Sequence, residues 1–295
     1  MHWIVPFARA GFEAPDLPAL GGLVARCAIE ARDDGEIDSP HPPHERALAR
    51  ALGWPVADDA PLPWAARAAR ADGIEVGAQA WALLTPVHWR VGSDAVHLAD
   101  PRELGLSDAD SRALFDAVRP LFESEGMPLA WGAATRWYAS HASFEQLATA
   151  SLDRAIGRNV DPWLPSPRHL RRLQNEVQML LHAHPINAAR EAAGAPAVNS
   201  FWISGCGIAR AEASVAVRLD DRLARPALAS DEAGWRAAWA TLDAELVAAP
   251  AFDRLTLCGE RGSVTLTPRA QTLWQRLAGS ITKPRGAAAA LLETL

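Results

Sequence analysis

Residues 168–207 contain the segment that best indicates the fold, RHLRRLQNEVQMLLHAHPINAAREAAGAPAVNSFWISGCG. Its first part, residues 168–182, repeats leucine and valine at helical spacing, which predicts a long helix with one buried face. Residues 187–193 predict a second, short helix. Residues 198–204 form an apolar run typical of a buried strand, and it leads into Gly205-Cys206-Gly207. Helices followed by a buried strand indicate a layered fold of mixed class.

The same signals extend over the rest of the chain. Further strands are predicted at residues 2–7, 75–91, 95–98, 127–140, 255–258 and 263–266, and further helices at residues 44–52, 62–71, 107–122, 144–156, 231–247 and 272–278. Residues 8–43 are rich in proline and glycine, and we expect them to be irregular. We therefore predict an α/β (or α+β) fold, with a mixed sheet, helices on its faces and a small antiparallel hairpin region around 75–140. No connector has the composition of a linker, so we expect residues 1–295 to form a single domain with a possible subdomain at 75–140.

Composition excludes several classes of function. The 295 residues are 49% hydrophobic, which fits a globular protein, and the net charge of −6 provides no overall cationic field for nucleic acid. No run of about 20 apolar residues occurs, so we expect no membrane span. Three distant cysteines without a CxxC pair argue against a disulfide framework or a zinc site, and they fit a cytoplasmic protein. We expect no metal and no cofactor.

The densest group of polar residues lies in the segment quoted above. Arg190 has the fork geometry that grips a carboxylate or phosphate, and main-chain amides near the glycines can hold an anion. In open α/β sheets, ligands bind where strands end at their carboxyl edge. We therefore predict an anion site formed by His184, Asn187, Arg190, Asn199, Gly205 and Gly207.

A structural interpretation of the same residues is also open. Asn187 has the position of a helix N-cap, and the glycines have the position of a turn. Cys206 is either a reactive thiol or a small buried filler. The twelve tryptophans are spread along the chain, which is typical of core and interface positions.

Several stretches resemble a known family. Residues 170–187 and 189–207, together with residues 84–89 and 151–165, resemble the RpfE-type regulatory proteins of proteobacteria, which are related to phosphoglycerate mutases. The pattern His184-Pro-x-Asn187, Arg190, Gly194-x-Pro196-x-x-Asn199, Gly205-x-Gly207 is also similar to archaeal-type cofactor-independent phosphoglycerate mutases. That resemblance implies the alkaline phosphatase superfamily, with two metal ions, an Asp-Gly pair after the first strand, a Ser or Thr nucleophile, and late Asp and His ligands.

The chain departs from that enzyme pattern at the ligand positions. The first strand continues into Pro6-Phe7-Ala8-Arg9, with no Asp-Gly pair, and no histidine follows His184. Residues 255–262 resemble the late strand of the enzymes, with Glu260-Arg261 in place of its Asp-His ligand pair. We therefore predict a regulatory-type protein without the two-metal centre that is non-catalytic and binds a small anionic ligand or a protein partner. Two alternatives are an active mutase or other phosphotransferase with a rearranged site, and a purely structural interaction protein.

Overall fold

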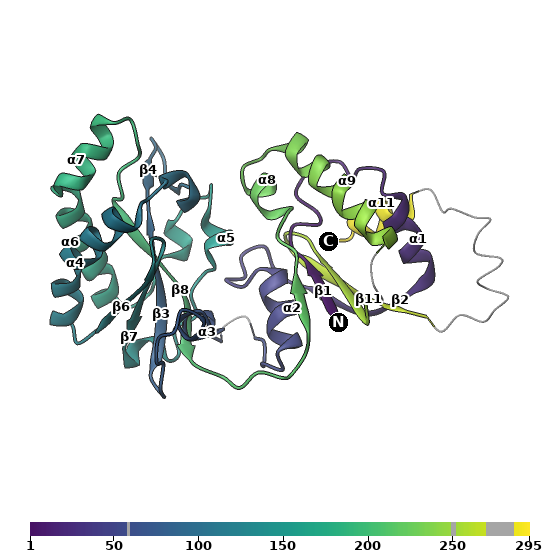
Figure 1. Cartoon of the computed structure of the whole chain (residues 1–295), viewed down its shortest axis with the longest axis horizontal. Coiled ribbons are helices and arrows are strands. Elements are labelled where there is room, and N and C mark those ends of the chain that lie inside the picture. The colour runs from purple at the N-terminus through teal and green to yellow at the C-terminus, as the bar shows by residue number, and fades with distance from the viewer. Residues whose placement is uncertain (58–59, 249–251, 270–285) are drawn as a thin grey trace. The chain divides into compact units, whose positions relative to one another are not determined.

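The chain folds into two compact units in the computed structural model, which describes residues 1–57, 60–248, 252–269 and 286–295 (Figure 1). Unit 1 combines Met1–Pro55 with Glu212–Leu295, and unit 2 is the intervening segment Val56–Ala211. The amide of Ala213 donates to the carbonyl of Leu52 at 2.9 Å, so the chain re-enters unit 1 beside its point of exit. The sequence predicts a single domain with a possible subdomain at 75–140, and neither crossing between the two units has the composition of a linker.

Unit 1 is built on a mixed five-stranded sheet. Strand β1 runs parallel to both of its neighbours, β9 and β10, whereas β11 runs antiparallel to β10 and β2. The strand order is β2-β11-β10-β1-β9. The strands are β1 (His2–Val5), β2 (Cys27–Asp34), β9 (Val217–Leu219), β10 (Arg254–Cys258) and β11 (Gly262–Pro268).

The two faces of this sheet differ in chemistry. One face carries apolar residues such as Trp3, Leu257 and Val264, and it is covered by α1 (Pro18–Arg26), α9 (Glu232–Ala248) and α11 (Ala287–Leu292). On the other face, α2 (Pro43–Ala51) packs over Ile4 and Cys258. A short helix, α8 (Ala224–Leu228), contacts α9. Residues alternate between the two faces, as the period of a strand requires.

The region expected to be irregular, residues 8–43, contains α1 and β2. For β2 the correction has a clear cause, since it is an edge strand with the sequence CAIEARDD, in which most residues are exposed and half are charged. Its sequence lacks the apolar alternation by which a strand is usually identified.

Unit 2 is built on an antiparallel four-stranded sheet with the order β6-β7-β3-β8. Its strands are β3 (Ala80–Val87), β6 (Leu129–Ala133), β7 (Arg136–Ser140) and β8 (Ser200–Ile208). A separate hairpin joins β4 (Trp89–Val91) to β5 (Val96–Leu98). The hairpin predicted from residues 75–91 and 95–98 is confirmed by β4 and β5, although its first strand begins at Ala80 and is divided into β3 and β4. The strand pair predicted at residues 127–140 is confirmed, and so is the mixed α/β class.

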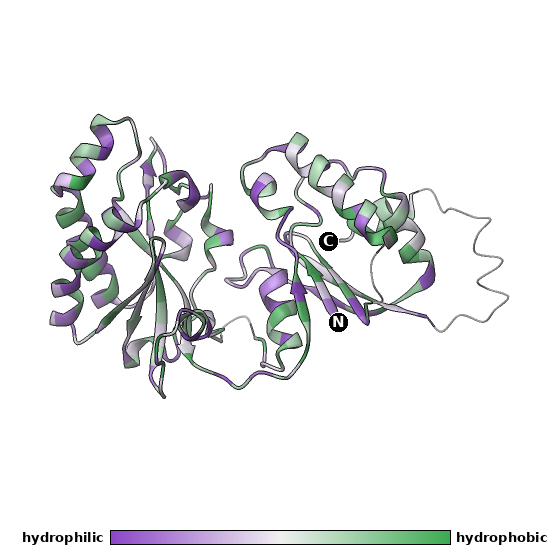
Figure 2. Ribbon diagram, in the orientation of Figure 1, coloured by the Kyte–Doolittle hydropathy of each residue, from purple (hydrophilic) through white to green (hydrophobic). Residues whose placement is uncertain are grey.

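Helices cover both faces of the second sheet. Helices α4 (Asp108–Ser124) and α6 (Arg168–His182) pack on one face, and α3 (Trp64–Ala71) packs on the other. Figure 2 shows hydrophilic and hydrophobic residues side by side on α4 and α6, as expected for helices with one buried face. The bounds predicted for α6 are confirmed, and so is the cap of α4, where Ser107 Oγ accepts from the amide of Asp110 at 3.1 Å.

Two predicted helices have other outcomes. Residues 144–156 form only a 3-10 turn (Ala142–Phe144) and the four-residue α5 (Leu152–Ala155), so the long helix predicted there is wrong. The helix predicted at residues 272–278 lies outside the described residues. Among the helices that the structure describes, none is long and apolar enough to span a membrane.

Candidate functional site

His184 and Asn187 lie at the start of α7 (Pro185–Ala192), and they have different structural roles. His184 is the N-cap, and its Nδ1 accepts from the amide of Ile186 at 3.3 Å. Asn187 is buried inside the helix; its Nδ2 donates to the carbonyls of Leu181 and Val198, and its Oδ1 accepts from the amide of Val198, all at 2.8 Å. Asn187 therefore links the end of α6 to Val198, just before β8. The N-cap role that the sequence suggested for Asn187 belongs to His184.

Arg190 also makes internal contacts. Its Nε donates to the carbonyl of Pro196 at 3.0 Å, and its terminal nitrogens donate to the carbonyl of Leu104 and pair with Asp110 at 3.8 Å. Only 8% of the residue is exposed. These contacts fasten α7 to the loop at Pro196, to the 3-10 turn that ends at Leu104 and to α4, and they occupy the guanidinium that we predicted to hold an anion.

Asn199 directly precedes β8 (Ser200–Ile208), and the two glycines lie inside that strand. The Asn199 side chain accepts from the amide of Trp89 at 2.7 Å and donates to its carbonyl at 2.9 Å, as a strand neighbour would. Strand β8 continues to Ile208, so the predicted end of the strand at residue 204 is wrong. Gly205 and Gly207 lie inside β8, beside a register shift against β3.

The glycines allow close packing with α3. A Cβ atom on Gly205 would lie 2.8 Å from the Ala65 nitrogen, and one on Gly207 would lie 3.2 Å from Pro63 Cβ. At about 3.3 Å per strand residue, Asn199 and Gly205 are roughly 20 Å apart. The structure therefore does not gather the six predicted residues into one site.

Cys206 lies between these glycines and is fully buried. Burial raises the pKa of its thiol to about 12, because the thiolate is poorly solvated there. Of the two alternatives for this residue, the geometry favours a small buried filler.

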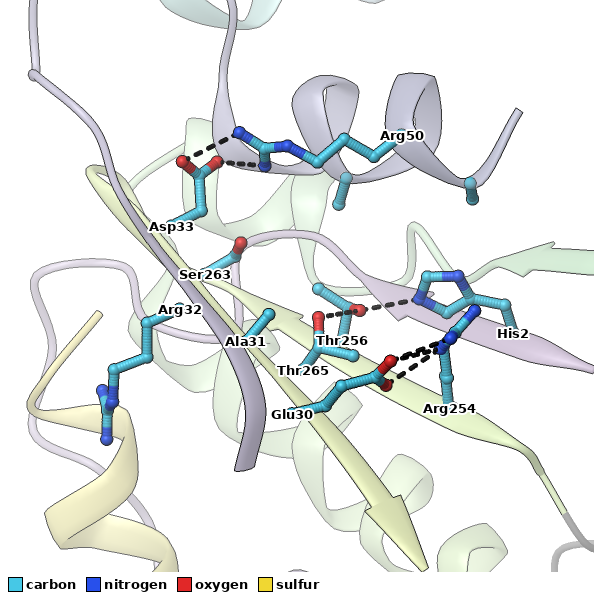
Figure 3. Close-up of a pocket in the computed structure, with 12 residues that line it drawn as sticks. His2, Glu30, Ala31, Arg32, Asp33, Arg50, Arg254, Thr256, Ser263 and Thr265 are labelled. Carbon is cyan, nitrogen blue, oxygen red and sulfur yellow. Dashed lines mark hydrogen bonds and ion pairs between the residues drawn. The ribbon is translucent and has the colours of Figure 1, made fainter. Parts of the chain in front are cut away.

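A cavity of about 310 Å³ lies in unit 1, on the face of the sheet beside α2 (Figure 3). It spreads over four adjacent strands, and it lies on the face of the sheet instead of at its carboxyl edge. Its lining combines a histidine, three hydroxyl groups and five charged groups with three small apolar residues. The lining residues are His2, Glu30, Ala31, Arg32, Asp33, Ala47, Arg50, Ala51, Arg254, Thr256, Ser263 and Thr265.

A chain of hydrogen bonds crosses the floor of this cavity. His2 Nε2 lies 2.7 Å from Thr256 Oγ1, which lies 2.9 Å from Thr265 Oγ1, so the chain spans β1, β10 and β11. Burial, and then the charge of Arg254, lower the pKa of His2 and favour the neutral imidazole. A neutral ring and hydroxyl groups can each donate or accept, so the floor suits a ligand with hydroxyl groups.

Arg254 and Glu30 form an ion pair at one end of the cavity. The Arg254 Nε lies 2.9 and 3.1 Å from the two carboxylate oxygens, and a terminal nitrogen lies 2.8 Å from one of them. The hydrogen bonds from Arg254 lower the pKa of Glu30. Figure 3 shows this pair beside the threonine hydroxyls.

Asp33 holds two arginines at the other end. Arg50 binds both of its oxygens, at 2.6 and 3.1 Å, and the buried Arg46 donates to one of them at 2.8 Å. Burial acts to raise the pKa of Asp33, but the hydrogen bonds from Arg50 and Arg46 outweigh it and hold that pKa below its usual value. This end of the cavity is therefore fixed by a charged network.

Sequence reasoning missed this cavity, although a signal was present. Residues 255–258 and 263–267 alternate apolar residues with Thr, Ser or Cys, which indicates a strand pair with one apolar and one polar face. The charged residues of β2 gave no comparable signal, because β2 itself was not predicted.

The ends of β1 and β10 are the places where the mutase resemblance puts metal ligands. The amide of Ala8 donates to the carbonyl of Cys258 at 2.7 Å, so the segments that follow the two strands lie side by side. Arg9 and Arg261 belong to these segments. Within the described ranges, no three or more His, Cys, Asp or Glu residues lie close enough together to hold a metal ion.

The large apolar side chains that are exposed are scattered through both units. Among the described residues they are Ile29, Ile37, Val91, Met179, Val215, Leu219 and Val247, none of which is aromatic. A large exposed surface rich in tryptophan would favour a purely structural interaction protein. The described residues show no such surface.

Two comparisons with known proteins found no relative: no family model matches the chain, and no curated protein matches it. Solved structures include two similar chains. The cofactor-independent phosphoglycerate mutase from Thermoplasma acidophilum DSM 1728 is 12% identical, with a TM-score of 0.37 over 99% of this chain and 98% of the mutase. The PH0037 protein from Pyrococcus horikoshii is 11% identical, with a TM-score of 0.45 over 92% of this chain and 88% of that protein. Both likenesses are remote.

Proposed function

We propose that this protein is a non-catalytic, regulatory-type protein of the RpfE kind that binds a small anionic ligand in the cavity of unit 1. The observation that carries the proposal is the position of the Arg254 guanidinium beside the hydroxyls of Thr256 and Thr265 on one sheet face. A guanidinium binds an acid group through two parallel hydrogen bonds, and hydroxyls orient the rest of a polar ligand. This cavity takes the place of the site predicted around Arg190, whose guanidinium is engaged internally.

The segments that follow β1 and β10 support binding over phosphoryl transfer. Two-metal phosphoryl transfer needs carboxylate and imidazole ligands that hold cations a few ångströms apart. These segments carry Arg9 and Arg261, and positive side chains oppose a site for divalent cations.

Calorimetric titration tests the binding proposal. We expect the protein to bind 3-phosphoglycerate or gluconate, two hydroxy acids of different charge, and Arg254→Met to weaken that binding at least tenfold. Arg90→Met is the matched control, since Arg90 is also an exposed arginine paired with one glutamate, Glu103, but it lies in unit 2. Absence of binding by the parent protein, or equal loss in both variants, contradicts the proposal.

The non-catalytic part of the proposal has its own test. We expect purified protein supplied with manganese or zinc to show no mutase turnover with 3-phosphoglycerate. Stoichiometric retention of either metal together with turnover would establish the enzymatic alternative instead.

A further inference from the structure

Glu30 faces the cavity because of an irregularity in β2. The register between β11 and β2 pairs Thr265 with Ala31 and then Leu266 with Ile29, which leaves Glu30 without a partner residue in β11. Such a bulge re-aims a side chain, and bulges are common beside binding sites. The Glu30 carboxylate thereby reaches across β11 to Arg254 of β10.

The ion pair between Glu30 and Arg254 is one in which another carboxylate can replace Glu30. The Arg254 Nε donates to one Glu30 oxygen at 2.9 Å and a terminal nitrogen donates to the other at 2.8 Å, which is the side-on arrangement that any free carboxylate can adopt. The side chains are 52% and 35% exposed, and ion pairs of this kind contribute little stability. In contrast, Asp33 is bound by two arginines and is only 19% exposed.

The charges around the cavity indicate the charge of its ligand. With His2 neutral, two carboxylates and three guanidinium groups leave a single positive charge on the lining and its ion pairs. The groups are Glu30 and Asp33 against Arg46, Arg50 and Arg254, whereas the guanidinium of Arg32 points away from the cavity and donates to Thr294. A ligand with one negative charge would balance this lining.

We propose that Glu30 is an internal stand-in for the acid group of the ligand, and that the ligand is a hydroxy-monocarboxylate. This inference rests on the proposed function. The ligand carboxylate replaces Glu30 on Arg254, and the ligand hydroxyls bind Thr256, Thr265 and Ser263. Glu30 thus lowers the affinity of the cavity and restricts it to acids that can compete for the guanidinium.

The variant Glu30→Gln tests this inference, because it removes the competing charge while it keeps the shape of the side chain. We expect gluconate to bind at least fivefold more tightly to Glu30→Gln than to the parent protein. Butyrate, which lacks hydroxyls, and sorbitol, which lacks a carboxylate, are expected to bind at least tenfold more weakly than gluconate. Glu103→Gln, the matching change at the Arg90 pair of unit 2, is expected to leave gluconate binding unchanged.

The outcomes separate this inference from the proposed function. If Arg254→Met abolishes anion binding but Glu30→Gln weakens gluconate binding or leaves it unchanged, the stand-in role is wrong and the proposed function stands. Tighter binding of inorganic phosphate than of gluconate by Glu30→Gln would overturn the choice of a monocarboxylate. If neither the parent protein nor Glu30→Gln binds any acid, the proposed function fails as well.

Discussion

At Asp33, burial and hydrogen bonding act on the carboxyl pKa in opposite directions, and the hydrogen bonds from Arg50 and Arg46 dominate. A carboxyl whose pKa is lowered in the folded state stabilises the fold above its unfolded pKa of about 3.9. That stabilisation is lost as the pH falls through the lower, folded value. The ionised form of Asp33 is thus part of the native state at neutral pH.

We expect Asp33→Asn to lower the free energy of unfolding by about 1–3 kcal/mol at pH 7, because Arg46 loses a charged partner in a buried place. The difference from the parent protein should shrink at pH 3, and urea unfolding at both pH values measures it. Asp116→Asn is the control, since Asp116 forms an exposed pair with Arg119 and should change stability by less than about 0.5 kcal/mol. A difference that grows toward pH 3 contradicts the account of Asp33.

Gly205 combines a backbone constraint with a steric one. Its φ of +62° lies in the left-handed region, and an added Cβ would lie 2.8 Å from the Ala65 nitrogen and 3.0 Å from Trp64 Cβ. A left-handed residue with a side chain costs about 1–2 kcal/mol, and overpacking adds about 1–3 kcal/mol. The close approach of α3 to β8 therefore requires glycine.

We expect Gly205→Ala to destabilise the protein by more than Gly157→Ala does. Gly157 has a similar φ of +73° but no atom within 4 Å of an added Cβ, so its substitution isolates the backbone effect. Thermal unfolding of the two variants measures the difference. Equal losses would show that α3 moves aside freely.

Helix α6 shows what the sequence predicts well at the scale of an element. Its bounds, Arg168–His182, and its buried residues Leu170, Leu173, Val177 and Leu181 follow from helical periodicity alone. The core that they enter is shared with α4 and the four-stranded sheet.

We expect Leu173→Ala to destabilise the protein by about 2–5 kcal/mol, because it removes a side chain that is 1% exposed and leaves a cavity. Met179→Ala, on the exposed side of the same helix with 76% exposure, should have an effect within about 0.5 kcal/mol. Chemical denaturation compares the two. A melting curve of Leu173→Ala that matches that of the parent would contradict the placement of this face.

Strand β2 and the cavity of unit 1 show why some parts of the fold and of the site were not predicted from the sequence. β2 is held by main-chain pairing with β11 and carries Glu30 and Asp33, so its sequence satisfies the needs of an exposed edge and not those of a core. The site predicted around Arg190 rested on residue types that suit anions. In the folded chain the side chains of Arg190 and Asn187 instead form hydrogen bonds with main-chain carbonyls and amides that tertiary packing places beside them. Such contacts join residues that are far apart in sequence, and local pattern does not specify them.

The inserted arrangement of unit 2 matters at the scale of the whole molecule. Unit 2 is a continuous segment with its own core, formed around Leu84, Phe122, Trp137, Leu173 and Phe201. Unit 1 instead joins the two ends of the chain, since His2 in β1 is paired with Arg254 in β10 and Val217 in β9.

We expect a fragment of residues 56–211 to fold alone, because all the strand partners of its sheet lie within it. A cooperative urea transition together with near-ultraviolet circular dichroism from its buried tryptophans would support this. A matched fragment of residues 1–55 should remain unfolded, because β1 lacks both of its neighbours. An unfolded 56–211 fragment would contradict the independence of unit 2.

Because the chain returns to Leu52 only at Ala213, unit 1 is completed after unit 2 during synthesis. Ribosomes add about 5–20 residues per second, so β1 is synthesised roughly 10–40 s before its neighbour β9. During that interval, Trp3, Ile4 and Val5, which are all buried in the finished protein, have no sheet to join. Unit 2 is synthesised completely within the same interval, so its sheet is complete before that of unit 1. The apolar strand β1 is therefore exposed to aggregation while the chain is still being translated.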